Sequence, residues 1–129
     1  MKKKRNPDTI HSPFSTYSHQ IELINENRLL ALSGQIGVDA SGKLADEVSD
    51  QLKLAWRNVG ENLLAADMAY EDIVKLTIYF VQNSIETNDR RHLFKELFGS
   101  ISPCMTVLYV SALGDPDMKV ELDVWASVE

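Results

Sequence analysis

The stretch Ile73-Val-Lys-Leu-Thr-Ile-Tyr-Phe-Val81 decides the fold, because it is an extended apolar run without a purely polar face. Successive side chains of a strand point to opposite faces of the sheet. One predicted face carries Val74, Leu76, Ile78 and Phe80, and the other carries Lys75, Thr77, Tyr79 and Val81. Both sets contain large apolar side chains, so we expect this strand to lie inside a sheet with both faces covered.

A helix is predicted on either side of this strand in the sequence. Before it, apolar residues recur at spacings of three and four over residues 46–66, which places one apolar stripe along a helix. After it, a shorter helix is predicted over residues 88–98, with Thr87 as its N-cap and Gly99 at its end. Because each helix buries a single stripe, the two helices together cover only one face of a sheet.

Further extended runs complete the pattern. Residues 17–24 and 28–36 flank the turn 25–27, which predicts a hairpin. Residues 105–113 and 119–128 are predicted to be the two closing strands. The predicted order is ββαβαββ, and the fold class is α+β, with one sheet and two helices on one of its faces.

The face without helices keeps apolar side chains, and we expect Tyr79, Val81, Val107 and Tyr109 among them. A large apolar face is rarely left in contact with water. We therefore expect a second copy of the chain to cover it.

The chain has 129 residues and one cysteine, which describes a single domain that needs neither a disulfide nor a zinc site. A single thiol indicates a reducing compartment, so we expect a cytoplasmic protein. Residues 1–13 hold two of the four prolines and no periodic apolar pattern. They are predicted to be an extended N-terminal arm before one domain over residues 14–129. No apolar run is long enough to span a bilayer or to form a signal peptide, so no membrane partner is expected.

The formal charge of −6 is unevenly distributed along the chain. Residues 2–5 (KKKR) are all basic, and the rest of the chain has nine basic against 19 acidic side chains, a charge of −10. Such a body repels phosphate backbones, which argues against nucleic acid as a partner. The basic terminus is either an anion-binding or nuclear-import patch or a disordered solubilising tail.

Five short blocks, none of them specific alone, occur in an order and spacing that resemble one protein family. They are Tyr17-Ser-His, Ser33-Gly-Gln-Ile-Gly, Asn62-Leu-Leu-Ala-Ala, Asp72-Ile-Val-Lys-Leu-Thr and Lys119-Val-Glu-Leu-Asp-Val. Together they span about residues 15–127 and resemble the Rid family, also called the YjgF/YER057c/UK114 or endoribonuclease L-PSP family. The resemblance implies a chorismate-mutase-like fold, a homotrimer whose sheets enclose a central barrel, and three ligand clefts between neighbouring subunits.

The best-known branch of this family hydrolyses an enamine or imine from amino-acid dehydratases to a keto acid and ammonia. The resemblance gives Glu121 the role of orienting the attacking water, and it places Tyr17, Ser33 and Gly34 in the lining of the substrate pocket. Met105 stands where that branch has the arginine that grips the substrate carboxylate.

Met105 is the main departure from the family pattern. Methionine has neither charge nor a hydrogen-bond donor, and loss of a bidentate carboxylate contact costs roughly a few kcal/mol. We therefore do not expect efficient deamination of 2-imino acids, and a ligand without a carboxylate fits the flexible methionine better. Arg91, near the position of the family's pocket asparagine, or Arg90 would return a guanidinium to the cleft; the alternative is that both are solvated surface residues.

Glu121 and Asp123 are two residues apart on a predicted strand and so share a face. This pair fits general acid–base chemistry, or it satisfies polar groups at a subunit interface. No two histidines have metal-ligand spacing, so neither a metal nor a cofactor is expected.

The leading hypothesis is a Rid-type hydrolase or deaminase in a homotrimer, acting on an imine or enamine metabolite at clefts between subunits. The alternative is a non-catalytic trimer that binds a small metabolite. A third hypothesis, an endoribonuclease or translation inhibitor, is disfavoured by the charge of −10 on residues 6–129.

Overall fold

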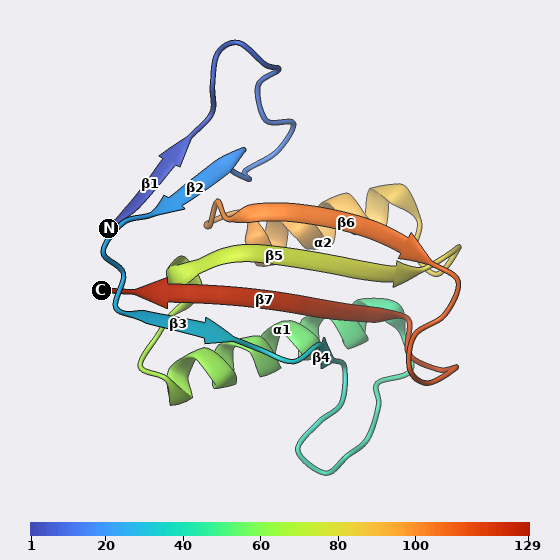
Figure 1. Cartoon of the computed structure of the whole chain (residues 1–129). Coiled ribbons are helices and arrows are strands. Elements are labelled where there is room, and N and C mark those ends of the chain that lie inside the picture. The colour runs from blue at the N-terminus through green and yellow to red at the C-terminus, as the bar shows by residue number, and fades with distance from the viewer.

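The computed structural model describes residues 1–129 as a mixed α+β fold. Figure 1 shows a five-stranded sheet with two helices packed behind it, and a separate two-stranded ribbon at the N-terminal end. The elements in chain order are β1 (Lys2–Arg5), β2 (Gln20–Leu23), β3 (Arg28–Ala31), β4 (Gln35–Ile36), α1 (Val48–Ala65), the 3₁₀ turn η1 (Tyr70–Asp72), β5 (Ile73–Val81), α2 (Thr87–Phe98), β6 (Cys104–Val110) and β7 (Val120–Val128). Both termini lie at the same end of the main sheet (Figure 1).

The main sheet has the strand order β3-β7-β5-β6, and β4 also pairs with β7. The strand predicted over residues 73–81 is β5, and it lies between β7 and β6, so the expectation of an interior strand is confirmed. β5 and β6 are parallel, with α2 in the connection between them, whereas the other pairs are antiparallel. The predicted order ββαβαββ omits β1 and merges β3 and β4 into one run.

Both helices cover the same face of the main sheet, as expected from their single apolar stripes (Figure 1). A core of 17 buried apolar residues lies between the helices and the sheet. Leu52, Ala55 and Val59 of α1 are fully buried in it, and α2 contributes Leu93 and Phe98. The spacings of three and four in the sequence therefore mark the side chains that hold the helices on the sheet.

Two local details differ from the sequence prediction. Glu86, rather than Thr87, is the N-cap of α2, and its carboxylate accepts a hydrogen bond from the backbone N–H of Asn88 at 3.3 Å. In β5 the register shifts between Ile73 and Lys75, so Ile73 is buried in the core and Val74 is only half-buried. Such a bulge adds one residue to a strand and interrupts the alternation of its side chains.

The predicted hairpin between residues 17–24 and 28–36 is wrong. β2 pairs with β1, and β3 pairs with β7 in the other sheet. The chain does turn between them, and Asn25 adopts a positive φ of 54° that suits a turn. The two strands nevertheless leave this turn for different partners, which no local pattern specifies.

The disordered-tail alternative for the basic terminus is also wrong, because residues 2–5 form β1. Acidic side chains partner two of its cations: Arg5 pairs with Glu22, and Lys2 Nζ lies 3.1 Å from Glu26 Oε1. The boundary predicted after residue 13 falls inside the connection between β1 and β2. A strand in an exposed ribbon buries little apolar surface, so it leaves no apolar alternation in the sequence.

Glu26 anchors the N-terminal ribbon to the main sheet. Only 5% of its side chain is exposed, and its carboxylate accepts hydrogen bonds from the N-terminal ammonium of Met1 and from Ser127 Oγ, both at 3.1 Å. Burial acts to raise the pKa of Glu26, but the hydrogen bonds from the N-terminal ammonium, Lys2 and Ser127 outweigh it and hold the pKa below its ordinary value.

The other face of the main sheet carries no helix (Figure 1). Tyr79 and Val81 lie on it, as expected, but Val107 and Tyr109 do not. The parallel register pairs these two with Ile78 and Phe80, whose side chains are in the core, so they point toward the helices.

We call this uncovered surface the open face. Several large apolar side chains on it are exposed: Leu29 by 61%, Leu108 by 44% and Trp125 by 42%. Polar side chains of β5 and β7, Glu121 and Asp123 among them, lie between these apolar groups.

Candidate functional site

Glu121 presents a carboxylate on the open face, at the point where β7 pairs with β4 and β5. Its side chain is half-buried and makes no hydrogen bond or ion pair with the rest of the chain. Its register partners are Ile36 on one side and Tyr79 on the other. The carboxylate is thus held in a partly desolvated place and keeps its acceptor capacity for a ligand or water.

Gly34 forms the floor under this carboxylate. A Cβ at this position would lie 2.6 Å from Glu121 Cδ and still closer to Oε2, so only glycine leaves the carboxylate where it is. The turn is itself fixed, because Leu32 N–H donates to the Val124 carbonyl at 3.1 Å and Gln35 Nε2 donates to the Ser33 carbonyl at 2.9 Å. The structure therefore brings together three of the predicted site residues: Glu121, Gly34 and the adjacent Ser33.

Asp123, the second carboxylate on this strand, lies one step further along the open face. Its register partner is Thr77, and Thr77 in turn pairs with Thr106 of β6. Lys75 Nζ donates to Thr106 Oγ1 at 2.8 Å in the same polar strip. The alternation that predicts a shared face for Glu121 and Asp123 is confirmed, and the strip joins them to hydroxyl groups.

Met105 lies on the other face of the sheet. Its register partner on β5 is the buried Leu76, and it is half-buried against the core beneath the helices. The register partner of Glu121 is Tyr79, three residues further along β5, so the two positions are about 10 Å apart along the strand. Within one chain, Met105 and Glu121 do not form a common pocket.

Tyr17 lies in the connection between β1 and β2, beside the start of β6. The next residue, Ser18, fixes this segment there: its N–H donates to the Pro103 carbonyl at 3.0 Å and its Oγ donates to the Ser102 carbonyl at 2.7 Å. The Tyr17 hydroxyl accepts a hydrogen bond from Phe14 N–H at 3.2 Å. Tyr17 is therefore near the Met105 end of β6 and not near Glu121.

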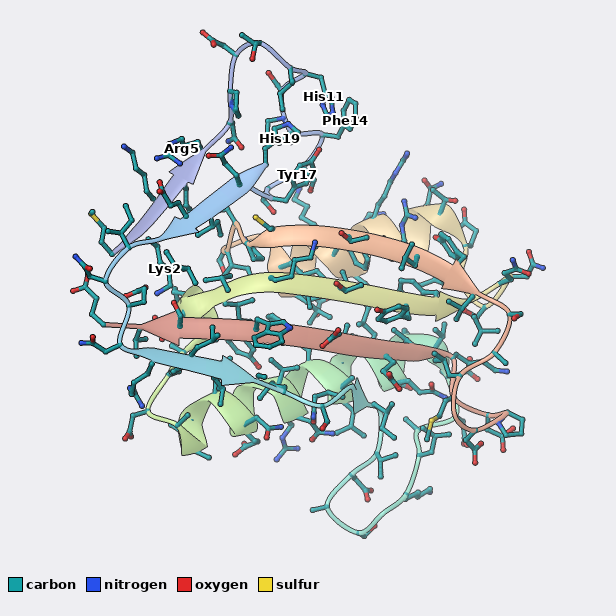
Figure 2. The ribbon with its side chains drawn as sticks, viewed as in Figure 1. Lys2, Arg5, His11, Phe14, Tyr17 and His19 are labelled. Atoms are coloured by element: carbon teal, nitrogen blue, oxygen red, sulfur yellow. The ribbon has the colours of Figure 1, made fainter.

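Tyr17 belongs to a cluster of four rings that the sequence prediction missed, with His11, Phe14 and His19 (Figure 2). His11 stacks on Phe14 with ring centroids 4.6 Å apart, and it meets His19 edge to face at 4.8 Å. The rings of His19 and Tyr17 are also nearly perpendicular to each other, with their centroids 5.6 Å apart. The ring spacing in the sequence has no strand or helix period, so no pattern predicts this cluster.

Arg90 and Arg91 stand on α2, and their surroundings differ. Arg90 is half-buried: Nη1 donates to the Tyr109 hydroxyl at 2.6 Å, and the guanidinium lies 5.8 Å from the centre of the Phe94 ring. Arg91 is exposed and makes no ion pair within the chain. Of the two arginines, Arg91 is thus the one whose guanidinium is available to a ligand.

Two wider properties bear on the kind of site. No group of three histidine, cysteine or carboxylate side chains is placed to hold a metal ion. Neither helix is both long and apolar enough to cross a membrane.

The family model described as "Endoribonuclease L-PSP" matches residues 9–128, nearly the whole chain. The chain belongs to the Rid (endoribonuclease L-PSP) family.

Named relatives of this Rid-family chain include RutC family proteins and deaminases. A RutC family protein of Buchnera aphidicola is 28% identical over 125 residues, which cover 94% of each chain. The human 2-iminobutanoate/2-iminopropanoate deaminase is 34% identical over 89 residues, which cover 67% of this chain and 64% of the human protein.

Solved structures agree with the fold. The Rid-family protein YyfB of Yersinia pestis superposes with a TM-score of 0.83 over 98% of both chains, at 24% identity. YyfA of the same organism gives a TM-score of 0.67 at 28% identity, over 99% of this chain and all of that one. Both are described as Rid proteins of unknown function.

In this Rid-family chain the predicted site residues occupy three places. Ser33, Gly34 and Glu121 lie together on the open face, Tyr17 lies by the start of β6, and Met105 lies on the helix side. Arg91 lies on α2, apart from Glu121. One chain thus presents the Glu121 carboxylate on the open face and carries the other predicted lining residues elsewhere.

Proposed function

We propose that this Rid-family protein hydrolyses an imine or enamine metabolite that has no carboxylate next to the reacting carbon, with Glu121 as the base that orients water. The observation that carries this proposal is the Glu121 carboxylate above Gly34, half-buried and without a partner in the chain. The names of several relatives as 2-iminobutanoate/2-iminopropanoate deaminases support the reaction type.

The proposed reaction balances without a cofactor. The carboxylate of Glu121 takes a proton from water as the water oxygen bonds to the imine carbon. With a protonated imine this gives a neutral carbinolamine, and Glu121 returns the proton to its nitrogen. The carbon–nitrogen bond then breaks, ammonia leaves as the carbonyl forms, and the hydroxyl proton passes to Glu121 or to water. A carboxylate that forms no hydrogen bond within the protein is suited to accept this proton.

Met105 supports a substrate without a carboxylate. Its thioether has no donor, and its side chain packs toward the core, so it supplies no anion contact. Arg91 is the guanidinium that would take a differently placed anionic group, because Arg90 is engaged by the Tyr109 hydroxyl.

We propose further that the reacting cleft lies between subunits of a homotrimer in the cytoplasm, with the open faces lining a central barrel. The separation of Glu121 from Tyr17, Met105 and Arg91 within one chain supports this, because a neighbouring subunit is then needed to bring the two groups together. The exposed apolar residues of the open face, Trp125 among them, support it as well.

A second candidate is a non-catalytic trimer that binds a small metabolite in the same cleft. The observation that favours it is Met105, because the position that grips the substrate carboxylate in the deaminase branch carries a side chain with neither charge nor hydrogen-bond donor. The two candidates differ in turnover and not in binding.

Ammonia release from two matched substrates generated in situ tests the proposal: 2-iminobutyrate and its neutral amide, 2-iminobutyramide. We expect the wild-type protein to accelerate hydrolysis of the amide and to act weakly on the acid, because a missing bidentate arginine contact costs about 100-fold or more. Met105→Arg is expected to shift the preference toward the acid. Equal, rapid turnover of the acid by the wild-type protein contradicts the substrate assignment, and no turnover of either compound favours the binding module.

A further inference from the structure

The turn at Ser33 and Gly34 lies under the Glu121 carboxylate but outside the pairing of the strands. β3 ends at Ala31, and β4 begins at Gln35. Neither residue of the turn forms a hydrogen bond with another backbone group. The floor under the carboxylate is therefore held in place by its neighbours in the chain and by side chains.

One side-chain amide, that of Gln35, links this turn to helix α1. Its Nε2 donates to the Ser33 carbonyl at 2.9 Å, and its Oε1 accepts a hydrogen bond from Asn62 Nδ2 at 3.1 Å. Asn62 Nδ2 also donates to the Asn58 carbonyl at 2.9 Å, one turn earlier in α1. We call these three hydrogen bonds, which connect the backbone of α1 to the Ser33 carbonyl, the amide relay.

Both side-chain amides of the amide relay satisfy their partners in only one orientation. A carbonyl oxygen only accepts, so the nitrogen of Gln35 faces the Ser33 carbonyl. For the same reason the nitrogen of Asn62 faces the Asn58 carbonyl, and its second N–H is left for the oxygen of Gln35. The amide relay thus gives the Ser33 carbonyl one direction, and because the peptide bond is planar and trans, it fixes the Gly34 N–H as well.

The amide relay starts from a part of α1 that is closely packed against the segment after the turn. Asn58 Nδ2 donates to the carbonyls of Ile36 and Val38 at 3.1 Å and 2.9 Å. The buried Gly37 between them packs directly on the helix, because a Cβ there would clash with the helix backbone. Asn62 extends this support by one helical turn, to the residues beneath the carboxylate.

We propose that Asn62 and Gln35 are positioning residues, which set the place of the Glu121 carboxylate from helix α1. The carboxylate makes no hydrogen bond within the chain and lies directly against Gly34, so packing on the turn is what locates it. A reacting group that is held by packing moves when the surface beneath it moves. The effect of these residues on imine hydrolysis rests on the proposed function of Glu121, but their effect on its position does not.

Two neutral variants of similar size break the amide relay, Asn62→Leu and Gln35→Met. Each is expected to lower kcat for 2-iminobutyramide about tenfold or more, because a displacement of 1 Å far from the chemistry costs up to about 100-fold. KM is expected to stay nearly unchanged, since neither side chain contacts the substrate. The matched control is Glu61→Leu, which adds the same side chain to an exposed position of α1 outside the amide relay and is expected to keep the wild-type kcat.

Double variants separate positioning from a merely structural role. In the Glu121→Gln protein, Asn62→Leu is expected to leave the residual rate unchanged, because the amide relay acts through the carboxylate that is already lost. Asn62→Leu combined with Gln35→Met is expected to be about as slow as the slower single variant, because both changes break the same chain of hydrogen bonds. Independent, multiplying effects in either pair would overturn the proposal.

NMR spectra of the full-length protein without substrate test the positioning independently of hydrolysis. In Asn62→Leu the backbone amide resonance of Gly34 and the side-chain carboxyl resonance of Glu121 are expected to shift, and in Glu61→Leu both are expected to keep their wild-type positions. Shifted resonances in a wild-type background that hydrolyses no imine would reject the proposed function and support the positioning. Unshifted resonances in Asn62→Leu, or equal shifts in the control, would overturn the positioning whatever the activity.

Discussion

Trp125 offers a direct test of the open face as a subunit interface. It is 42% exposed and lies on β7 beside Lys75, its register partner on β5. An aromatic side chain buries about 150–250 Å² when it is fully covered, so roughly 60–105 Å² of Trp125 remains to be covered by a neighbour. At about 25 cal/mol per Å², this is about 1.5–2.6 kcal/mol per subunit and about 5–8 kcal/mol for a trimer.

We predict that Trp125→Lys dissociates the assembly. The variant loses this apolar contact and adds a second ammonium opposite Lys75, so the association constant is expected to fall by roughly 10⁴-fold or more, at 1.4 kcal/mol per factor of ten. Light scattering after gel filtration, over a range of protein concentrations, measures the change. The fluorescence of the wild-type protein should also shift to the red on dilution, because Trp56 is buried within each chain and only Trp125 becomes solvated.

Leu64→Lys is the matched control. Leu64 is 67% exposed, but it is on α1 and so belongs to the covered side of the sheet. It is expected to leave the oligomeric state unchanged. A monomeric wild-type protein, or a trimer that survives Trp125→Lys, refutes the assignment of the open face as an interface.

Three other predictions concern single side chains. Gly34→Ala should change the free energy of unfolding by no more than about 1 kcal/mol, because the end of the Glu121 side chain can swing away. A displacement of the carboxylate by about 1 Å should nevertheless lower the rate of imine hydrolysis about 100-fold. An unchanged rate would show that the Glu121 carboxylate takes no part in the reaction. Gln51→Leu removes three hydrogen bonds from a side chain that is 1% exposed, so urea unfolding should show a free energy of unfolding lower by about 3 kcal/mol or more. Asn62→Ala, at an exposed position, should lower it by less than about 1 kcal/mol. Equal losses in the two variants would contradict this account. The pKa of Glu26 is lowered in the folded chain, so its carboxylate stabilises the fold above its ordinary pKa of 4.5, and this stabilisation is lost as the pH falls through the folded-state pKa. The difference in thermal stability between the wild-type protein and Glu26→Gln should therefore shrink on acidification below about pH 4.5. A pH-independent difference would argue against the ion-pair network around Glu26.

The elements that the sequence predicts well are those that bury a periodic apolar pattern. The strand over residues 73–81 and both helices are within two residues of their predicted ends, because their buried side chains repeat at the period of the element. The same reasoning predicts that both helices share one face of the sheet.

The pairing of strands is less predictable from the sequence. β1 is a charged strand whose cations meet Glu22 and Glu26, and those contacts leave no apolar alternation. The faces of Val107 and Tyr109 depend on the parallel register with β5, which the sequence of β6 alone does not specify.

The candidate site shows the same division. The family blocks predict Glu121 and Gly34 as site residues, but their contact is a finding of the structure: a glycine leaves room for the carboxylate, which gives the two residues a physical reason to occur together. The four-ring cluster lies within the β1–β2 connection but follows no helix or strand period, so no sequence pattern marks it. The contact of this connection with the start of β6, through Ser18 N–H and the Pro103 carbonyl, joins distant segments that only the folded chain brings together.

The central claim is that Glu121 is the base in imine hydrolysis. The most direct measurement is the rate of ammonia release from 2-iminobutyramide by Glu121→Gln, compared with the wild-type protein and with Asp123→Asn on the same face. The account predicts a rate at least about 100-fold lower for Glu121→Gln, because general-base contributions are typically 10²–10⁴-fold, and a nearly unchanged rate for Asp123→Asn. Retention of the full rate by Glu121→Gln would contradict it.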